Sequence, residues 1–114
     1  MSRQILTDTA TGAAAIAHSY TVRDNDEIIR VTCKFSIAPT SSENYTITLD
    51  SLAGAAYDVV LYSVDPSVAS ATSIVWSPDK RERFVAGDII TVAYTNTDTR
   101  TYGSVVYLDT NPAM

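Results

Sequence analysis

The chain has 114 residues, of which 46% are hydrophobic and 18% charged, and this composition predicts one globular domain rather than a disordered chain. Its net charge of −5 argues against non-specific binding to nucleic acid, which needs a basic surface. The single cysteine cannot form an internal disulfide, and no apolar run is long enough for a transmembrane helix, so we expect no membrane contact.

Residues 1–17 are rich in Thr, Ala and Gly and predict an extended N-terminal arm ahead of the folded domain. Three apolar side chains, Ile5, Leu6 and Ile16, are the positions where such an arm would contact a neighbour. A frayed terminus fits the same composition. The stretch lacks the charged start and continuous apolar run of a signal peptide, so we expect no secretion signal and synthesis in the cytoplasm.

Residues 18–64 predict four short strands separated by turn-forming residues. A first strand over residues 18–22 precedes a turn at residues 23–26. A second strand follows, in which alternation places five apolar residues on one buried face: Ile29, Val31, Cys33, Phe35 and Ile37. Residues 45–49 alternate in the same way, with Tyr45 on the buried face. Residues 57–64 are apolar on both faces, which predicts a central strand covered from both sides, with Tyr57 in the core.

The second half of the chain predicts further strands and ends in a hairpin. A short strand over residues 73–76 carries the only tryptophan, Trp76, and a charged loop follows over residues 77–83. Strands over residues 89–95 and 101–108 are joined by a polar tip, and residues 110–114 predict a loose C-terminal tail. Seven or eight short strands without helical periodicity predict an all-β fold, a single antiparallel β-sandwich or jelly-roll-like domain over residues 18–109.

Residue types that catalyse reactions or bind metals are sparse in this sequence. The only histidine is His18, and Cys33 lies on the apolar phase of its strand, which suits an inert core thiol. One cysteine and one histidine cannot fill a structural zinc site. Residues 24–27 offer four oxygen-bearing side chains but lack the glycine and spacing of a calcium loop. We therefore expect a protein that is not an enzyme and holds no cofactor or metal.

Two groups of residues are candidates for contacts with other macromolecules. Residues 80–83 carry three of the eight basic side chains and predict either a solvated loop or a contact with an acidic copy of the same chain. The tyrosines fit a core, a subunit interface or a sugar-stacking face. The predicted partner-binding set joins both groups to the arm: Ile5, Leu6, Ile16, Lys80, Arg81, Arg83, Tyr94 and Tyr102.

Three segments carry a resemblance to a known class of proteins: residues 44–49 (NYTITL), 57–62 (YDVVLY) and 85–96 (VAGDIITVAYTN). With these strands, the chain resembles the small β-sandwich proteins of tailed bacteriophage particles, namely head decoration (cement) proteins, head-fibre bases and minor tail components. The resemblance implies a virion protein that contacts other copies of itself and major capsid or tail proteins as a homo-oligomer, such as a trimer or hexamer. It assigns no role to any single residue. The alternative is a carbohydrate-binding or receptor-binding module, which rests on Trp76 and the tyrosines.

Overall fold

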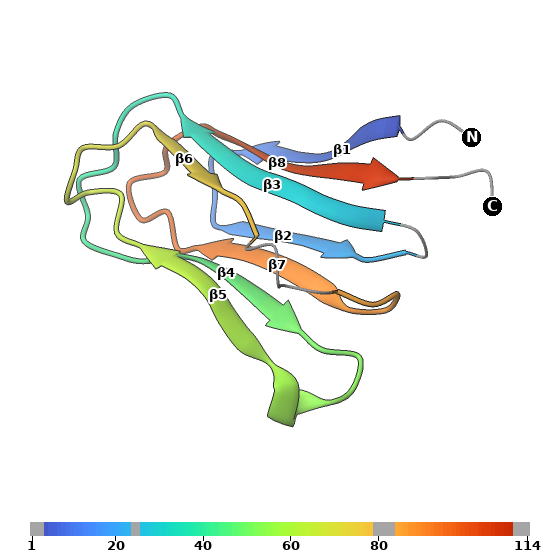
Figure 1. Ribbon diagram of the computed structural model, residues 1–114. Helices are drawn as coiled ribbons and strands as arrows, with labels where there is room; N and C mark the ends of the chain where they lie inside the picture. The colour runs from blue at the N-terminus through green and yellow to red at the C-terminus, as the bar shows by residue number, and fades with distance from the viewer. Residues whose placement is uncertain (1–3, 24–25, 79–83, 111–114) are drawn as a thin grey trace.

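Two four-stranded antiparallel sheets face each other in the computed structural model, which describes residues 4–23, 26–78 and 84–110 (Figure 1). Sheet I has the order β1 (Gln4–Gly12), β8 (Tyr102–Thr110), β3 (Asp26–Phe35) and β6 (Ser73–Trp76). Sheet II has the order β2 (Ile16–Thr21), β7 (Ile89–Tyr94), β4 (Tyr45–Asp50) and β5 (Val59–Val64). One 3-10 turn, η1 (Ala55–Tyr57), precedes β5. The predicted all-β antiparallel sandwich is thus confirmed, with eight strands in the described residues.

The core lies between the sheets because alternate side chains of each strand point inward. Val31, Cys33 and Phe35 of β3 are buried as predicted, and Tyr45 of β4 is fully buried. The rings of Phe35 and Tyr94 meet across the sandwich with centroids 5.5 Å apart and a tilted geometry. Burial of each large aliphatic side chain contributes about 1.5–3 kcal/mol, so these contacts are the main stabilisation of the fold.

A register shift in β3 changes which residues face the core. The pairing of β3 with β8 is irregular between Ile28 and Arg30, which leaves Ile29 as an extra residue in the strand. Ile28 is therefore buried, whereas Ile29 is only half-buried. The predicted inward position of Ile29 was wrong because a bulge reverses the alternation on one side of itself. Ile37 is exposed because it lies beyond the end of β3.

Strand β5 lies at the edge of sheet II and not at its centre. It pairs with β4 on one side only, and Figure 1 shows β5 and η1 extending away from sheet I. The prediction of a strand covered on both sides was therefore wrong. The predicted core position of Tyr57 was wrong too, because this residue lies in η1 with 65% of its surface exposed.

Most of the stretch predicted as an arm lies within the sandwich. Strand β1 pairs with β8 over nine residues, from Gln4 opposite Thr110 to Gly12 opposite Tyr102. Ile16 and Ala17 begin β2, so the predicted boundary after residue 17 falls inside a strand of sheet II. Of the predicted C-terminal tail, only Thr110 lies in the described part of the chain, where it ends β8. None of the described segments forms a helix of the length and hydropathy needed to span a membrane.

Candidate interaction surface

The predicted partner-binding residues are not brought together by the fold. Ile5 and Leu6 are exposed on β1, and alternation places them on opposite faces of sheet I. Ile16, Tyr94 and Tyr102 are buried between the sheets, so they have almost no surface to present to a partner. They are inward because each occupies the core phase of its strand. The remaining predicted members lie outside the described residues: Lys80, Arg81 and Arg83.

The aromatic residues are mostly turned inward, which bears on the sugar-binding alternative. Trp76 is only 9% exposed, and Tyr45 is fully buried. Tyr107 lies under the guanidinium of Arg30, whose Cζ is 4.1 Å from the ring centroid. Among the described aromatic residues, Tyr57 is the one with a largely exposed ring. An array of exposed rings that could stack on sugars is therefore not formed by these residues.

Exposed apolar side chains lie instead in the first residues of β5 and in the segment that precedes it. They are large hydrophobic side chains that are about half exposed or more, and we call them the β5 surface: Leu52, Tyr57, Val59 and Val60. Val59 and Val60 are successive residues of a strand and point to opposite faces of sheet II, so the β5 surface lies on both sides of this edge rather than on one face. Exposed apolar side chains that lie near one another mark an interaction site more often than scattered ones do. The sequence analysis missed this surface because it predicted that the strand over residues 57–64 is covered on both sides.

The turn that carries Leu52 is held by a buried carboxylate at the start of β7. Asp88 is 4% exposed, and its Oδ1 accepts a hydrogen bond of 2.9 Å from the backbone N–H of Leu52. Its Oδ2 accepts one of 3.0 Å from the N–H of Val85. Gly87 has φ of 99°, and a Cβ at this position would lie 2.9 Å from Leu52 Cδ2. The Gly87–Asp88 pair therefore fixes the position of Leu52 at the β5 surface.

A groove of about 430 Å³ adjoins the β5 surface. It is lined by Leu49 and Val60 together with two carboxylates, Asp50 and Asp58, and by Thr91 of β7. Asp58 also supports the turn, because its Oδ1 accepts a hydrogen bond of 2.7 Å from the N–H of Ser51. The surface therefore combines apolar contact area with acidic groups at its rim.

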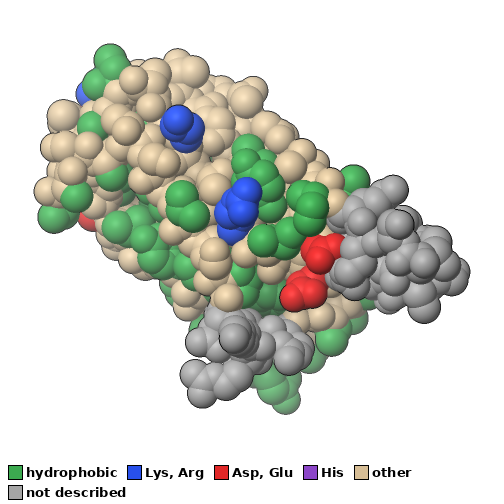
Figure 2. Space-filling view, turned by 45° about the horizontal axis from the view of Figure 1, so that its top comes forward, with side chains coloured by type: hydrophobic (Ala, Val, Ile, Leu, Met, Phe, Trp, Pro, Cys, Tyr) green, Lys and Arg blue, Asp and Glu red, His purple; other side chains and the backbone are tan. Residues whose placement is uncertain are grey.

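The free edge of β5 has one of the usual protections of edge strands, a bulge, and lacks the charged residues and proline that serve the same purpose. Its sequence, Val-Val-Leu-Tyr-Ser-Val, contains no charged residue and no proline, which are the residues that commonly keep an edge from pairing. A register shift opposite Ile47 and Thr48 gives the strand one bulge. Figure 2 shows another face of the molecule, on which few charged side chains interrupt the uncharged surface. In water, an open apolar edge of this kind favours pairing with another strand.

A second group of side chains, missed by the sequence analysis, links three strands through the only histidine. His18 Nε2 lies 2.8 Å from Asp8 Oδ2, and its Nδ1 lies 2.8 Å from Ser104 Oγ. The three residue types match those of a hydrolase triad. However, Ser104 is fully buried, so its hydroxyl is not accessible to a substrate. The arrangement connects β1 and β8 of sheet I to β2 of sheet II.

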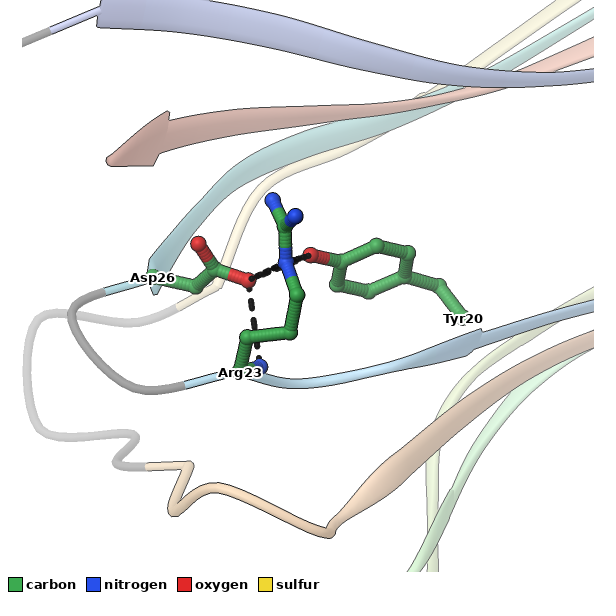
Figure 3. Close-up of polar contacts among 3 residues, drawn as sticks. All are labelled: Tyr20, Arg23 and Asp26. Carbon is green, nitrogen blue, oxygen red and sulfur yellow. Dashed lines mark hydrogen bonds and ion pairs between the residues drawn. The ribbon is translucent and has the colours of Figure 1, made fainter. Parts of the chain in front are cut away.

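A third polar group closes the connection between β2 and β3 (Figure 3). The Tyr20 hydroxyl donates to Asp26 Oδ2, and Arg23 Nε lies 3.1 Å from both the Tyr20 hydroxyl and Asp26 Oδ2. Burial, followed by the hydrogen bond to Asp26, raises the pKa of Tyr20 to about 12. Among the described residues, no cluster of three His, Cys, Asp or Glu side chains is placed to hold a metal ion.

The loops at the opposite end of β4 are joined by Asp98. Its Oδ2 accepts hydrogen bonds from the N–H groups of Thr40 at 2.6 Å and Ser41 at 2.8 Å, and its Oδ1 accepts one from Ser41 Oγ at 2.6 Å. The Ser41 hydroxyl and these two N–H groups hold the pKa of the Asp98 carboxyl well below its usual range. Both oxygens of this carboxylate already accept hydrogen bonds within the loops, so little capacity is left to bind a ligand.

Comparison with known proteins identifies no relative: no family model matches the chain, and no curated protein matches it significantly.

Proposed function

We propose that this protein is a non-enzymatic structural component of a bacteriophage particle, a capsid decoration protein or a minor tail protein, that works through protein–protein contacts. The observation that carries the proposal is the β5 surface, an apolar strand edge that the single chain leaves uncovered. Such an edge is a hazard on a free monomer and an advantage in an assembly, where a neighbouring chain covers it.

The partners in this proposal are other copies of the chain and the major capsid or tail protein of the particle. Many copies on one particle act multivalently, so a modest contact at each β5 surface produces a firm attachment. The acidic rim formed by Asp50 and Asp58 favours a partner surface with basic side chains beside an apolar strand.

The buried position of Ser104 supports a non-enzymatic role. Asp8, His18 and Ser104 have the residue types of a hydrolase triad, but the Ser104 hydroxyl is buried in the core, where a substrate cannot reach it. The carbohydrate-binding alternative has weaker support, since Trp76 points into the core and Tyr57 is the one strongly exposed ring among those described above.

The test uses a lysate of cells in which the gene is expressed together with its neighbouring genes. Phage particles in this lysate are separated by banding in a density gradient. Quantitative mass spectrometry then measures copies of the chain per copy of the major capsid protein. We expect the chain to band with the particles at a fixed ratio. Recovery only at the top of the gradient would overturn the proposal, and specific binding of the free chain on a glycan array would favour the alternative.

A further inference from the structure

Strand β1 differs from the other strands because none of its described side chains belongs to the hydrophobic core or is a partly buried hydrophobic side chain packed against it, as Leu61, Tyr62 and Val64 of β5 are. None of the side chains of residues 5–12 is buried, and the hydrophobic core begins at Ile16. On the face that turns toward sheet II, β1 carries Leu6, Asp8 and Ala10, opposite Leu108, Val106 and Ser104 of β8, which are all buried. The strand is therefore held by its backbone ladder with β8 and by the contact between Asp8 and His18.

The place that β1 occupies cannot stay empty at low cost. Without β1, His18 Nε2 would lose its partner Asp8, and the inner residues Ser104 and Val106 would lose cover. The N–H and C=O groups along one edge of β8 would also lose their partners. The bared edge of β8 would bind water, but a buried polar group without a partner costs about 1–3 kcal/mol, so His18 and the uncovered inner residues favour a strand at this position.

The position is also selective for the sequence of β1. It places a carboxylate, Asp8, opposite His18, and four residues later Gly12 lies beside the ring of Tyr102. A Cβ at Gly12 would lie 3.4 Å from Tyr102 Cε2, an ordinary van der Waals contact, so the selectivity rests on the carboxylate opposite His18. The β1 strand of an identical chain meets this condition, because it brings the same Asp8 carboxylate to His18.

The segment that links β1 to β2 is short and open. Residues 13–15, three alanines, cross from sheet I to sheet II, and all three are exposed. In the part of the chain that the structure describes, one side-chain hydrogen bond reaches this segment, from Asn96 Nδ2 to the carbonyl of Ala14 at 2.8 Å. A short hinge next to a terminal edge strand is the arrangement that permits exchange of that strand between copies.

We propose that β1 is an exchangeable strand: β1 of one copy pairs with β8 of a second copy, and its Asp8 binds His18 of that second copy. Every contact of the closed chain is reproduced in the exchanged form, so the two forms differ mainly in the hinge and in the entropy of association. High local concentration favours the exchanged form. The inference goes beyond the proposed function and does not depend on the particle in which the protein works.

The test uses two single-cysteine variants, Thr9→Cys on β1 and Val105→Cys on β8. These residues are paired across the two strands on the outer face of sheet I. Paired Cα atoms lie about 4.5–5.5 Å apart in antiparallel sheets, within the range that a disulfide spans. The native Cys33 stays in place, because burial raises its pKa to about 12 and keeps the thiol protonated.

The two variants are mixed over a concentration series, incubated, oxidised and separated on a non-reducing gel. A mixture of Thr9→Cys with Ser63→Cys, which lies on β5 of the other sheet, is the control. Exchange predicts several-fold more mixed disulfide dimer than the control gives, with a yield that rises with concentration.

A second variant, lacking Ala13 and Ala14, removes the slack that lets β1 fold back on its own chain. We expect this variant to be a stable dimer by light scattering, with the wild-type circular dichroism spectrum. A monomeric shortened chain, or a mixed-disulfide yield at the control level, overturns the exchange. Both experiments use purified protein alone, so either result is independent of particle binding.

Discussion

The hydroxyl of Tyr45 offers a test of how tightly the core is packed around polar atoms. Tyr45 is fully buried between the sheets, and its hydroxyl has no hydrogen-bond partner among the described residues. Burial raises the pKa of this side chain, as expected for a phenol that is far from water. Tyr45→Phe removes the hydroxyl while the ring and its contacts remain.

The expected effect is a gain in stability. An unsatisfied buried hydroxyl costs about 1–3 kcal/mol, and its removal recovers most of that cost. The oxygen leaves a small void, which forfeits part of the gain through lost van der Waals contacts. We therefore expect the free energy of unfolding to rise by about 1 kcal/mol, which corresponds to a Tm increase of about 4 °C for a chain of this size.

The assay is thermal and urea unfolding of Tyr45→Phe beside Tyr20→Phe as a matched control. The Tyr20 hydroxyl donates to Asp26 and contacts Arg23, so its removal should lower stability by about 1 kcal/mol after allowance for partial solvent exposure. The two identical chemical changes thus have opposite predicted signs. Destabilisation of Tyr45→Phe by 1 kcal/mol or more would show that the hydroxyl has a partner, such as a bound water, and would refute the reasoning.

Three further predictions follow from the turns and the polar groups. Gly87→Ala should cost about 1–3 kcal/mol because of its positive φ and the clash with Leu52, whereas Gly103→Ala, which has open space, should change unfolding in urea by less than about 0.5 kcal/mol. Hydrogen bonds lower the pKa of Asp98, so the stability that its ionised carboxylate contributes is present above about pH 4 and is lost as the pH falls. Asp98→Asn should therefore reduce the fall in the free energy of unfolding at acid pH; an unchanged fall would contradict this. Asp8→Asn should speed amide hydrogen exchange in β1 more than in β3, and a uniform change along the chain would argue against a separately held β1.

The sequence contained enough information for the fold class but not for the order of the strands. Period-two alternation identified β4 closely, and the short strand predicted over residues 73–76 coincides with β6. Alternation says nothing about neighbours, and so an apolar strand such as β5 was assigned to a sheet centre. Its edge position follows from long-range pairing, in which β4 already has β7 on its other side.

Local irregularities account for most of the other differences. The bulge in β3 exchanges the roles of Ile28 and Ile29, and a bulge leaves no reliable mark in a single sequence. The contact of Asp8 with His18 joins residues ten positions apart across a sheet-to-sheet crossing, and no spacing rule anticipates it. The hydrogen bond from Leu52 to Asp88 joins residues 36 positions apart, and no local pattern predicts it.

The claim that the β5 surface attaches this protein to a particle is tested most directly by measuring particle occupancy with Val60→Lys and Val75→Lys. Both valines are more than half exposed at the edge strand of their sheet, Val60 on β5 and Val75 on β6. The Val60→Lys chain should fold normally, because its ammonium lies beside Asp50 and Asp58 at the groove. We predict that wild type and Val75→Lys saturate particles equally, while Val60→Lys binds at least about tenfold more weakly, a loss of ~1.4 kcal/mol. Equal occupancy by all three chains would contradict the account.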